Sequence, residues 1–325
     1  MEIFFNRNNI RYGEIDQVRI VQSCNGLLLC TDSEWPRLYY VYNPSTKNYA
    51  CLPPAHYYSR NDNGFFSCGD FRLAFDPRKS THYKVVLAHR PSSGTWIHVY
   101  SSETRKWTPS NYRLSYFWFD HFYTSVYWND AFHWLEGQNK KIEHCKLIFE
   151  NNEQPIMTTI DIPNGLHRGR NFLGCFHETG VDAHLMTVHI PHLLHLQVKF
   201  FESRGSLLLA SRHDIGSTDF TIYQMMRGSS VWSPRYVVNI RNFPDWSIQT
   251  HVWGICLGER EEDAFVLINL AGRVVKYYPI TKTTTEVFDM KADETDDEDD
   301  DAVSDCSPYA VVPTIYEFIP SLASV

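Results

Sequence analysis

The chain has 325 residues, of which 43% are hydrophobic and 15% aromatic, so it has ample material for a core and is not disordered overall. Its formal net charge of −8 comes entirely from eight acidic residues between positions 293 and 301. The rest of the chain is therefore close to neutral. A neutral body lacks the long-range field that attracts nucleic acid or an anionic membrane, so we expect neither as a partner.

The cysteines and the N-terminus indicate the compartment. Eight cysteines form no C-x-x-C pair, and no run of apolar residues approaches the ~18 needed to cross a membrane. The first residues also lack the unbroken apolar stretch of a signal peptide. These features predict reduced, mostly buried thiols in a cytoplasmic or nuclear protein.

Five segments repeat a short apolar strand, a polar turn and a second strand rich in aromatic residues. The pentapeptide Asn43–Lys47 shows the physical basis of the turn. Asn before Pro is kept out of the helical region, Pro presets φ, and the Ser and Thr hydroxyls can cap nearby amides. In chain order, the strands we expect cover residues 27–30 with 39–42, 73–75 with 83–87 and 97–101, 126–135 with 160–163, 206–210 with 220–223 and 236–238, and 264–268 with 274–278 and 287–288.

Hairpins that recur at roughly 40 to 60 residues are typical of propeller blades, each of which needs its neighbours to bury its faces. We therefore predict an all-β fold, a propeller-like array of antiparallel hairpin repeats, with a β-sandwich as the alternative. Residues 192–198 could form a brief helical turn. Like charges that cannot pack predict a disordered acidic loop over 291–306. The apolar tail that follows is expected to close the last blade or to pair with the first.

Several motifs, in their order and spacing, resemble the F-box-associated domain of plant F-box proteins. The motifs are Ser23–Leu29, Tyr42–Lys47, Leu73–Pro77, His82–Val86, Val99–Thr104, Trp128–Leu135, Glu202–Gly205 and Pro320–Leu322. The resemblance covers residues 21–325 and implies a propeller-like domain. It further implies a non-catalytic, substrate-recognition module of a Skp1–cullin–F-box (SCF) E3 ubiquitin ligase, with target proteins as partners.

The F-box that holds Skp1 in that family is not recognisable in this sequence. Residues 1–20 precede the first motif and lack the leucine- and proline-patterned helical segment that an F-box requires. Skp1 is therefore expected as a partner only if an F-box lies upstream. Two alternatives stay open: an F-box-less scaffold or decoy that binds targets without joining the ligase, and a propeller enzyme or glycan binder.

No catalytic residue, cofactor site or metal site is predicted. The chain has no G-x-S-x-G, H-E-x-x-H, Walker or G-x-G-x-x-G motif. Pro191 disturbs the helix that a zinc site would need, and no Cys or carboxylate completes the set; the histidines concerned are His184, His189, His192 and His195. Asp76 and Asp161 are interpreted as turn or strand-end residues. We interpret five tryptophans as structural residues that pack between blades, namely Trp107, Trp128, Trp134, Trp232 and Trp253.

Two segments carry candidate interaction sites. The aromatic stretch 112–123 joins two predicted blades, and we take its most aromatic part as a candidate partner-binding edge, with an outer strand as the alternative. These residues are Tyr116, Phe117, Trp118 and Phe119. Thr295 precedes three acidic residues, a setting that acid-directed kinases favour, and is a candidate phosphorylation site. Otherwise the acidic run is a solvated spacer.

Overall fold

The computed structural model of the chain is built of β-strands and two short 3-10 helices in the part that it describes. That part comprises residues 2–5, 18–32, 38–55, 70–89, 95–114, 122–138, 141–148, 156–163, 198–212, 217–241, 243, 246, 250–270, 273–289 and 315–318. Within these residues, the strands form five four-stranded antiparallel sheets and one two-stranded sheet. No helix in these ranges is long and apolar enough to span a membrane.

Each four-stranded sheet is one blade, with its strands in chain order. Blade 1 contains β2 (Arg19–Cys24), β3 (Leu27–Thr31), β4 (Tyr39–Asn43) and β5 (Asn48–Cys51); blade 2 contains β6 (Asp70–Ala74), β7 (Lys84–His89), β8 (Thr95–Ser101) and β9 (Lys106–Leu114). Blade 3 contains β10 (Val126–Trp128), β11 (Ala131–Gln138), β12 (Lys141–Ile148) and β13 (Ile156–Ile160); blade 4 contains β14 (Val198–Ser203), β15 (Ser206–Arg212), β16 (Asp219–Met225) and β17 (Ser233–Asn239). Blade 5 contains β18 (His251–Cys256), β19 (Phe265–Leu270), β20 (Arg273–Tyr278) and β21 (Thr283–Asp289).

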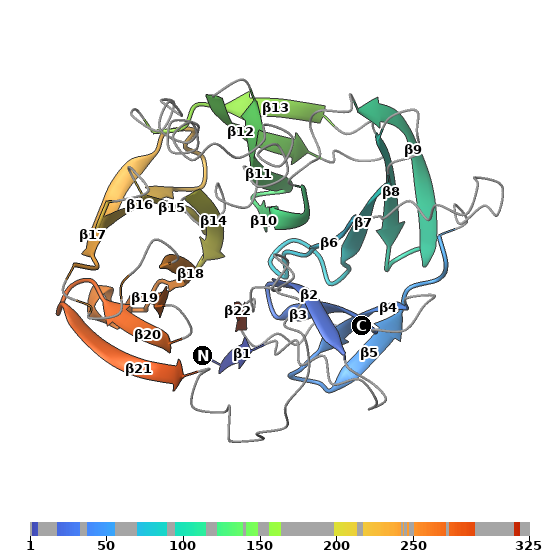
Figure 1. The fold of residues 1–325 in the computed structure, drawn as a ribbon. Coiled ribbons are helices and arrows are strands. Elements are labelled where there is room, and N and C mark those ends of the chain that lie inside the picture. Colours follow the sequence, from blue (N-terminus) through green and yellow to red (C-terminus); the bar gives the residue numbers. More distant parts are fainter. Residues whose placement is uncertain are drawn as a thin grey trace, which may run out of the picture.

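The blades surround a central axis, with the first strand of each blade inside and the last outside (Figure 1). The inner strands of neighbouring blades contact one another, β2 against β6, β10 against β14 and β14 against β18. The predicted propeller is therefore confirmed, and the β-sandwich alternative is wrong. The described residues supply five complete blades.

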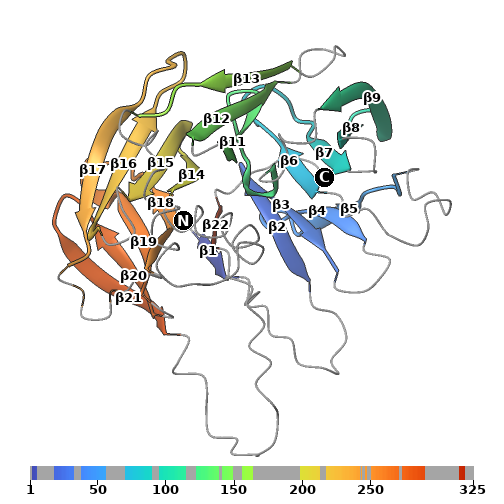
Figure 2. The same ribbon diagram turned by 45° about the horizontal axis from the view of Figure 1, so that its top comes forward.

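The two ends of the chain meet between blade 5 and blade 1. β1 (Glu2–Phe5) and β22 (Ile315–Phe318) form an antiparallel pair in which Glu2 lies opposite Phe318. β22 contacts both β18 and β2, and the pair occupies the gap between these blades (Figure 2). The C-terminal strand thus pairs with β1, which belongs to residues 1–20. We expected the C-terminal strand to close the last blade or to pair with the first blade. It pairs with β1 instead, so this expectation was wrong.

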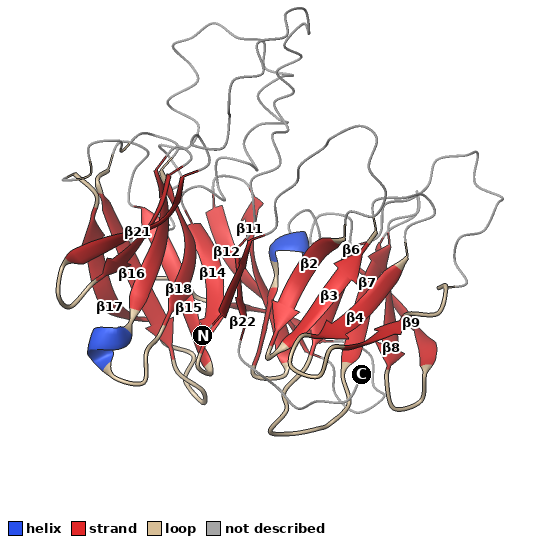
Figure 3. Ribbon diagram, turned by 90° about the horizontal axis from the view of Figure 1, so that it is seen from below, coloured by secondary structure: helices blue, strands red, loops and turns tan. Residues whose placement is uncertain are grey.

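The hairpin turns take the backbone geometry that short connections between twisted strands require. Both turn residues have positive φ at Asn25–Gly26, Asn129–Asp130 and Arg204–Gly205, as two-residue hairpins of type I′ demand. These turns, the other connections from first to second strands and the described connections from third to fourth strands lie on one face of the ring, which we call the turn face. Figure 3 shows this face with the 3-10 helix η3 (Glu261–Asp263), whereas η2 (Phe122–Thr124) lies on the opposite face.

The core lies between the blades rather than inside them. Separate clusters of buried apolar residues fill the spaces between blades 1 and 2, 2 and 3, 3 and 4, and 4 and 5. Leu73 and Val85, for example, are fully buried against Leu27 and Leu29 of blade 1. Burial of each such side chain contributes about 1.5 to 3 kcal/mol, so each blade depends on its neighbours for stability.

Several predictions about individual residues can be compared with this core. Trp128, Trp134 and Trp253 are buried, as expected, whereas Trp107 and Trp232 are only half-buried. Among the described cysteines, Cys51 is exposed and the free thiols of Cys24, Cys30, Cys145 and Cys256 are buried. Val198 begins strand β14 instead of ending a helical turn, and residues 192–197 lie outside the described residues.

Candidate binding face around the propeller axis

The structure does not describe the residues that we singled out for partner binding or phosphorylation. β9 ends at Leu114, and the segment after it is outside the described residues until Phe122, which is buried in η2. The candidate phosphorylation site and the histidine cluster also lie outside the described residues. All the candidates that lie there are Tyr116, Phe117, Trp118, Phe119, Thr295, His184, His189, His192 and His195. The corresponding hypotheses stay predictions.

Asp76 anchors a cluster of charges near the axis on the turn face. Its backbone and side chain hold the turn after β6, because its carbonyl accepts from Lys79 N and its carboxylate from Arg78 N. This is the turn role that the sequence predicted. In addition, the carboxylate accepts from Arg78 Nε at 3.0 Å and from Arg227 Nη2, in blade 4, at 3.0 Å. Burial alone would raise the pKa of Asp76, but these hydrogen bonds lower it to about 2.

Gly205 lies beside both guanidinium groups, in a turn that requires positive φ. A side chain there would begin 3.4 Å from Arg78 Nη1 and 3.6 Å from Arg227 Nε, and the residue has φ of +73°. Its carbonyl accepts from Trp128 Nε1 at 2.8 Å, and its N–H donates to Glu202 Oε1 at 2.9 Å. Blades 2, 3 and 4 thus meet at one glycine, whose positive φ is a backbone conformation that residues with a Cβ rarely adopt.

The charges of this cluster are arranged in two layers. The Asp76 side chain is only 5% exposed, whereas those of Arg78 and Arg227 are 57% and 33% exposed. Glu202 is half-buried, and burial raises its pKa. The carboxylates therefore lie toward the protein interior and the guanidinium groups toward solvent, so this balanced cluster presents its cationic groups at the surface.

Hydrogen bonds between neighbouring blades fix the turns around this cluster. Asn25 Nδ2 donates to the Phe75 carbonyl at 2.6 Å, and the Gln22 amide both accepts from Leu73 N and donates to Leu73 O. Between blades 4 and 5, Leu257 N donates to Ser203 Oγ at 2.9 Å. Since these bonds join backbone to side chain, they hold the turns in defined positions relative to one another.

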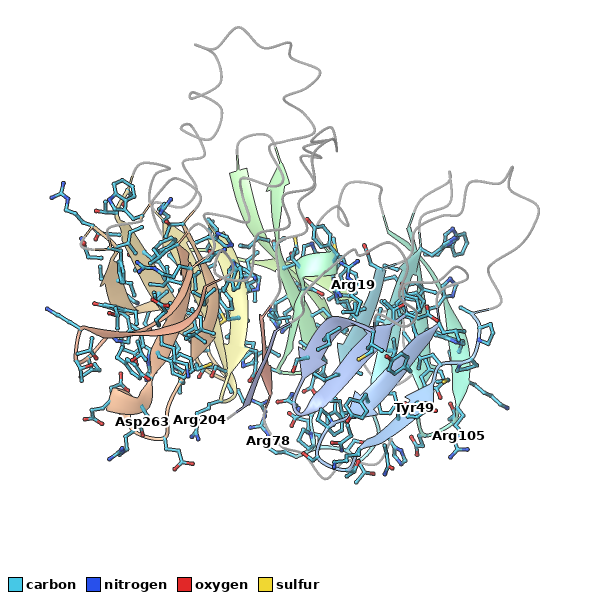
Figure 4. The ribbon with its side chains drawn as sticks, turned by 60° about the horizontal axis from the view of Figure 1, so that its bottom comes forward. Arg19, Tyr49, Arg78, Arg105, Arg204 and Asp263 are labelled. Atoms are coloured by element: carbon cyan, nitrogen blue, oxygen red, sulfur yellow. The ribbon has the colours of Figure 1, made fainter. Side chains whose placement is uncertain are left out.

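Two further ion pairs extend the charged surface outward. Lys79 pairs with Asp130 of blade 3, and Arg204 Nη2 lies 3.2 Å from Glu259 Oε1 of blade 5. Beyond Glu259, blade 5 presents the acidic helix η3, where Arg235 and Tyr236 of blade 4 both donate to Glu261. Figure 4 shows Arg78, Arg204 and Asp263 along the turn face, whereas Arg19 lies toward the opposite face.

The hairpin between β16 and β17 places apolar side chains beside this surface. Met226 and Val231 are 56% and 71% exposed and flank the turn that carries Arg227. The Met226 sulfur accepts from Gln224 Nε2 at 3.0 Å, and Val231 N donates to Ser229 Oγ at 3.0 Å. The Met226 sulfur and the Val231 backbone are thus hydrogen-bonded within this hairpin, beside Arg227.

One small cavity lies among the described residues. This cavity, lined by Thr124, Leu135 and residues 198–200, has room for about one water molecule. Pockets for small molecules commonly measure about 300 to 1,000 Å³. Among the described side chains, no three His, Cys, Asp or Glu residues gather as metal ligands would.

These features define a five-bladed β-propeller whose turn face is rigid and charged at its axis. A family model described as the F-box associated beta propeller domain matches residues 3–178. Since this match covers more than half of the sequence, the chain belongs to the family of F-box-associated β-propeller domains.

Known proteins show similarity over different lengths. F-box protein At5g07610 of Arabidopsis thaliana is 28% identical over an alignment 344 residues long. The alignment covers 94% of this chain and 70% of that protein. F-box protein At5g49610 of the same plant is 31% identical over 166 residues, which cover 47% of this chain and 44% of that protein. Among solved structures, the β-propeller domain of the Trilobed protease from Pyrococcus furiosus superposes with a TM-score of 0.39 and 8% identity, covering 83% of this chain and 70% of that one.

Proposed function

We propose that this chain is the target-binding module of an F-box subunit of a Skp1–cullin ubiquitin ligase, and that it is not itself catalytic. The family and the F-box relatives support this proposal. In such a subunit, an F-box would hold Skp1 while the propeller holds the target. The proposal includes a cytoplasmic or nuclear location, where the ligase and its targets meet.

The observation that carries the proposal is the construction of the turn face. Loops on a rigid scaffold are the usual place for recognition, and here hydrogen bonds between blades fix the turns of different blades against one another. The face exposes cations, anions and aliphatic side chains together. A mixed polar and apolar surface of this kind is what protein interfaces use.

Binding to Skp1 tests the ligase part of the proposal. Purified Skp1 would be immobilised and incubated with this chain and with the product of the reading frame extended upstream. We expect the extended product to bind and this chain alone to remain in solution. The control is the extended product with its F-box helices deleted, which should not bind.

The alternative is a scaffold or decoy that binds targets without joining the ligase. Failure of both products to bind Skp1, while each still folds cooperatively, would contradict the ligase role and leave this alternative. Cooperative folding is checked by thermal unfolding, because the blades stabilise one another and should melt together.

A further inference from the structure

We propose that the turn face at the axis binds an acidic protein segment that carries an aliphatic or aromatic side chain next to its carboxylates. The surface consists of Arg78, Lys79, Arg204 and Arg227 with the apolar pair Met226 and Val231. This inference rests on the proposed target-binding function and names the chemistry of the target. It concerns residues that the sequence did not single out.

The layered charges provide the first argument. The carboxylates of Asp76 and Glu202 lie on the interior side of Arg78 and Arg227, whose guanidinium groups are exposed to solvent. Arg204 and Lys79 add two more exposed cations, each paired with a carboxylate at its side. Asp76 already binds the Nε and Nη2 groups of Arg78, so an acidic segment would bind the guanidinium groups through their remaining N–H groups.

The apolar pair provides the second argument. Met226 and Val231 stand on the same turn as Arg227, so an apolar side chain of the partner can bury them while its carboxylate reaches the guanidinium. The hydrogen bonds to the Met226 sulfur and to Val231 N hold this hairpin in one conformation, which lowers the entropic cost of binding.

The acidic side of blade 5 limits which anions fit. Glu259, Glu262 and the helix η3 place negative charge beside Arg204. A broad anionic surface such as a membrane or a nucleic acid would cover these carboxylates as well and be repelled. A narrow peptide can follow the cations across the axis and avoid blade 5, so we favour a protein segment over a membrane or a nucleic acid.

A library of random twelve-residue peptides displayed on phage, selected on the folded chain, tests the inference. We expect enriched peptides to combine Asp or Glu with Leu, Ile, Met, Val or Phe. A synthetic copy of one enriched peptide should bind the chain at least about threefold more weakly after R204E or V231D alone and at least about tenfold more weakly after both. The binding should also weaken with added salt, because exposed charges are screened.

Two matched variants on the same molecule serve as controls. Arg105 is an exposed arginine at positive φ in a turn of the same face, as Arg204 is, but it lies in the outer hairpin of blade 2. Val237 is 63% exposed on β17, in the same blade as Val231. R105E and V237D should leave peptide binding within about twofold of the unmodified chain, and all four variants should melt at similar temperatures.

Three results would overturn the inference. One is enrichment of basic or uncharged peptides, and another is equal binding of the selected peptide by the R204E/V231D and R105E/V237D chains. The third is tighter binding to phosphatidylserine vesicles than to the peptide, with loss in the R204E/V231D chain. None of these results concerns Skp1 binding. The peptide-binding inference can therefore be wrong while the ligase role is right, and the ligase role can be wrong while the peptide-binding inference is right.

Discussion

A buried histidine pair should make this propeller sensitive to mild acid. His133 and His144 are completely buried, and His133 Nδ1 lies 2.9 Å from His144 Nε2. His133 Nε2 lies 3.0 Å from the Trp128 carbonyl, which can only accept, so His133 donates there. Because burial lowers the pKa of both rings, neither takes a second proton at neutral pH, and His133 Nδ1 accepts from His144 Nε2. Each ring is therefore neutral and carries one proton. A second proton on either ring would place an uncompensated charge in the core.

The size of the effect follows from the pKa values. Burial lowers the pKa of His133 to about 3, and burial lowers that of His98, in β8, to about 4. In the unfolded chain both titrate near 6.5. Because the unfolded chain takes up protons first, stability is present above pH 6.5 and is lost as the pH falls toward the folded pKa values. Between about pH 7.5 and pH 5, each of the two should remove about 2 kcal/mol.

The expected total of about 4 kcal/mol is a large part of the 5 to 15 kcal/mol that stabilises a typical domain. Burial also lowers the pKa of His144, which acts in the same direction. Asp76, with its pKa of about 2, is protonated only below this range. Burial raises the pKa of Glu202, which acts with the opposite sign. A histidine variant is therefore needed to isolate the contribution of the pair.

Urea unfolding at about pH 7.5 and pH 5, followed by the fluorescence of the nine tryptophans, measures the loss. We expect H133Q to lose about 2 kcal/mol less than the unmodified chain between these pH values, whatever its stability at neutral pH. H82Q, at an exposed turn residue, should leave the pH dependence unchanged. Equal pH dependence of H133Q and the unmodified chain would refute the role of the buried ring.

Three further changes test the contacts around the axis and at the ring closure. G205A should destabilise the chain by about 1 kcal/mol in thermal unfolding, since it puts a Cβ on a residue with φ of +73°; a neutral effect would contradict this backbone conformation. W128F should cost about 1 kcal/mol in urea unfolding, because it removes the hydrogen bond to the Gly205 carbonyl, and an unchanged midpoint would argue against that bond. Removing residues 315–325 deletes β22 and should lower the melting temperature by several degrees, whereas a melting temperature that stays the same would show that β1 and β22 do not close the ring.

Most middle and outer strands could be predicted from sequence because their chemistry is local, although β12 of blade 3 was missed. The turn at Asn43–Lys47 and the apolar runs beside it specify a hairpin without help from distant residues. Inner strands β2, β14 and β18 were not predicted. They mix apolar residues with polar ones such as Gln22 and Glu202, whose side chains bind the backbone of neighbouring turns rather than follow a simple alternation.

The candidate binding face could not be predicted for a related reason. Asp76 looks like an ordinary turn residue, and its partner Arg227 lies 151 residues away in another blade. Only closure of the ring brings the two together. His133 and His144 meet within one blade, across the neighbouring strands β11 and β12, and neither lies in the densest histidine region of the sequence.

The most direct test of the proposed function follows ubiquitin on the proteins that bind this propeller. Proteins captured by proximity labelling around the full-length product would be compared with proteins whose ubiquitination changes when the gene is removed. We predict that the captured proteins lose ubiquitin without the gene and regain it when the unmodified gene is restored. Captured proteins with unchanged ubiquitination in both conditions would contradict the proposal that this propeller selects targets for a ubiquitin ligase.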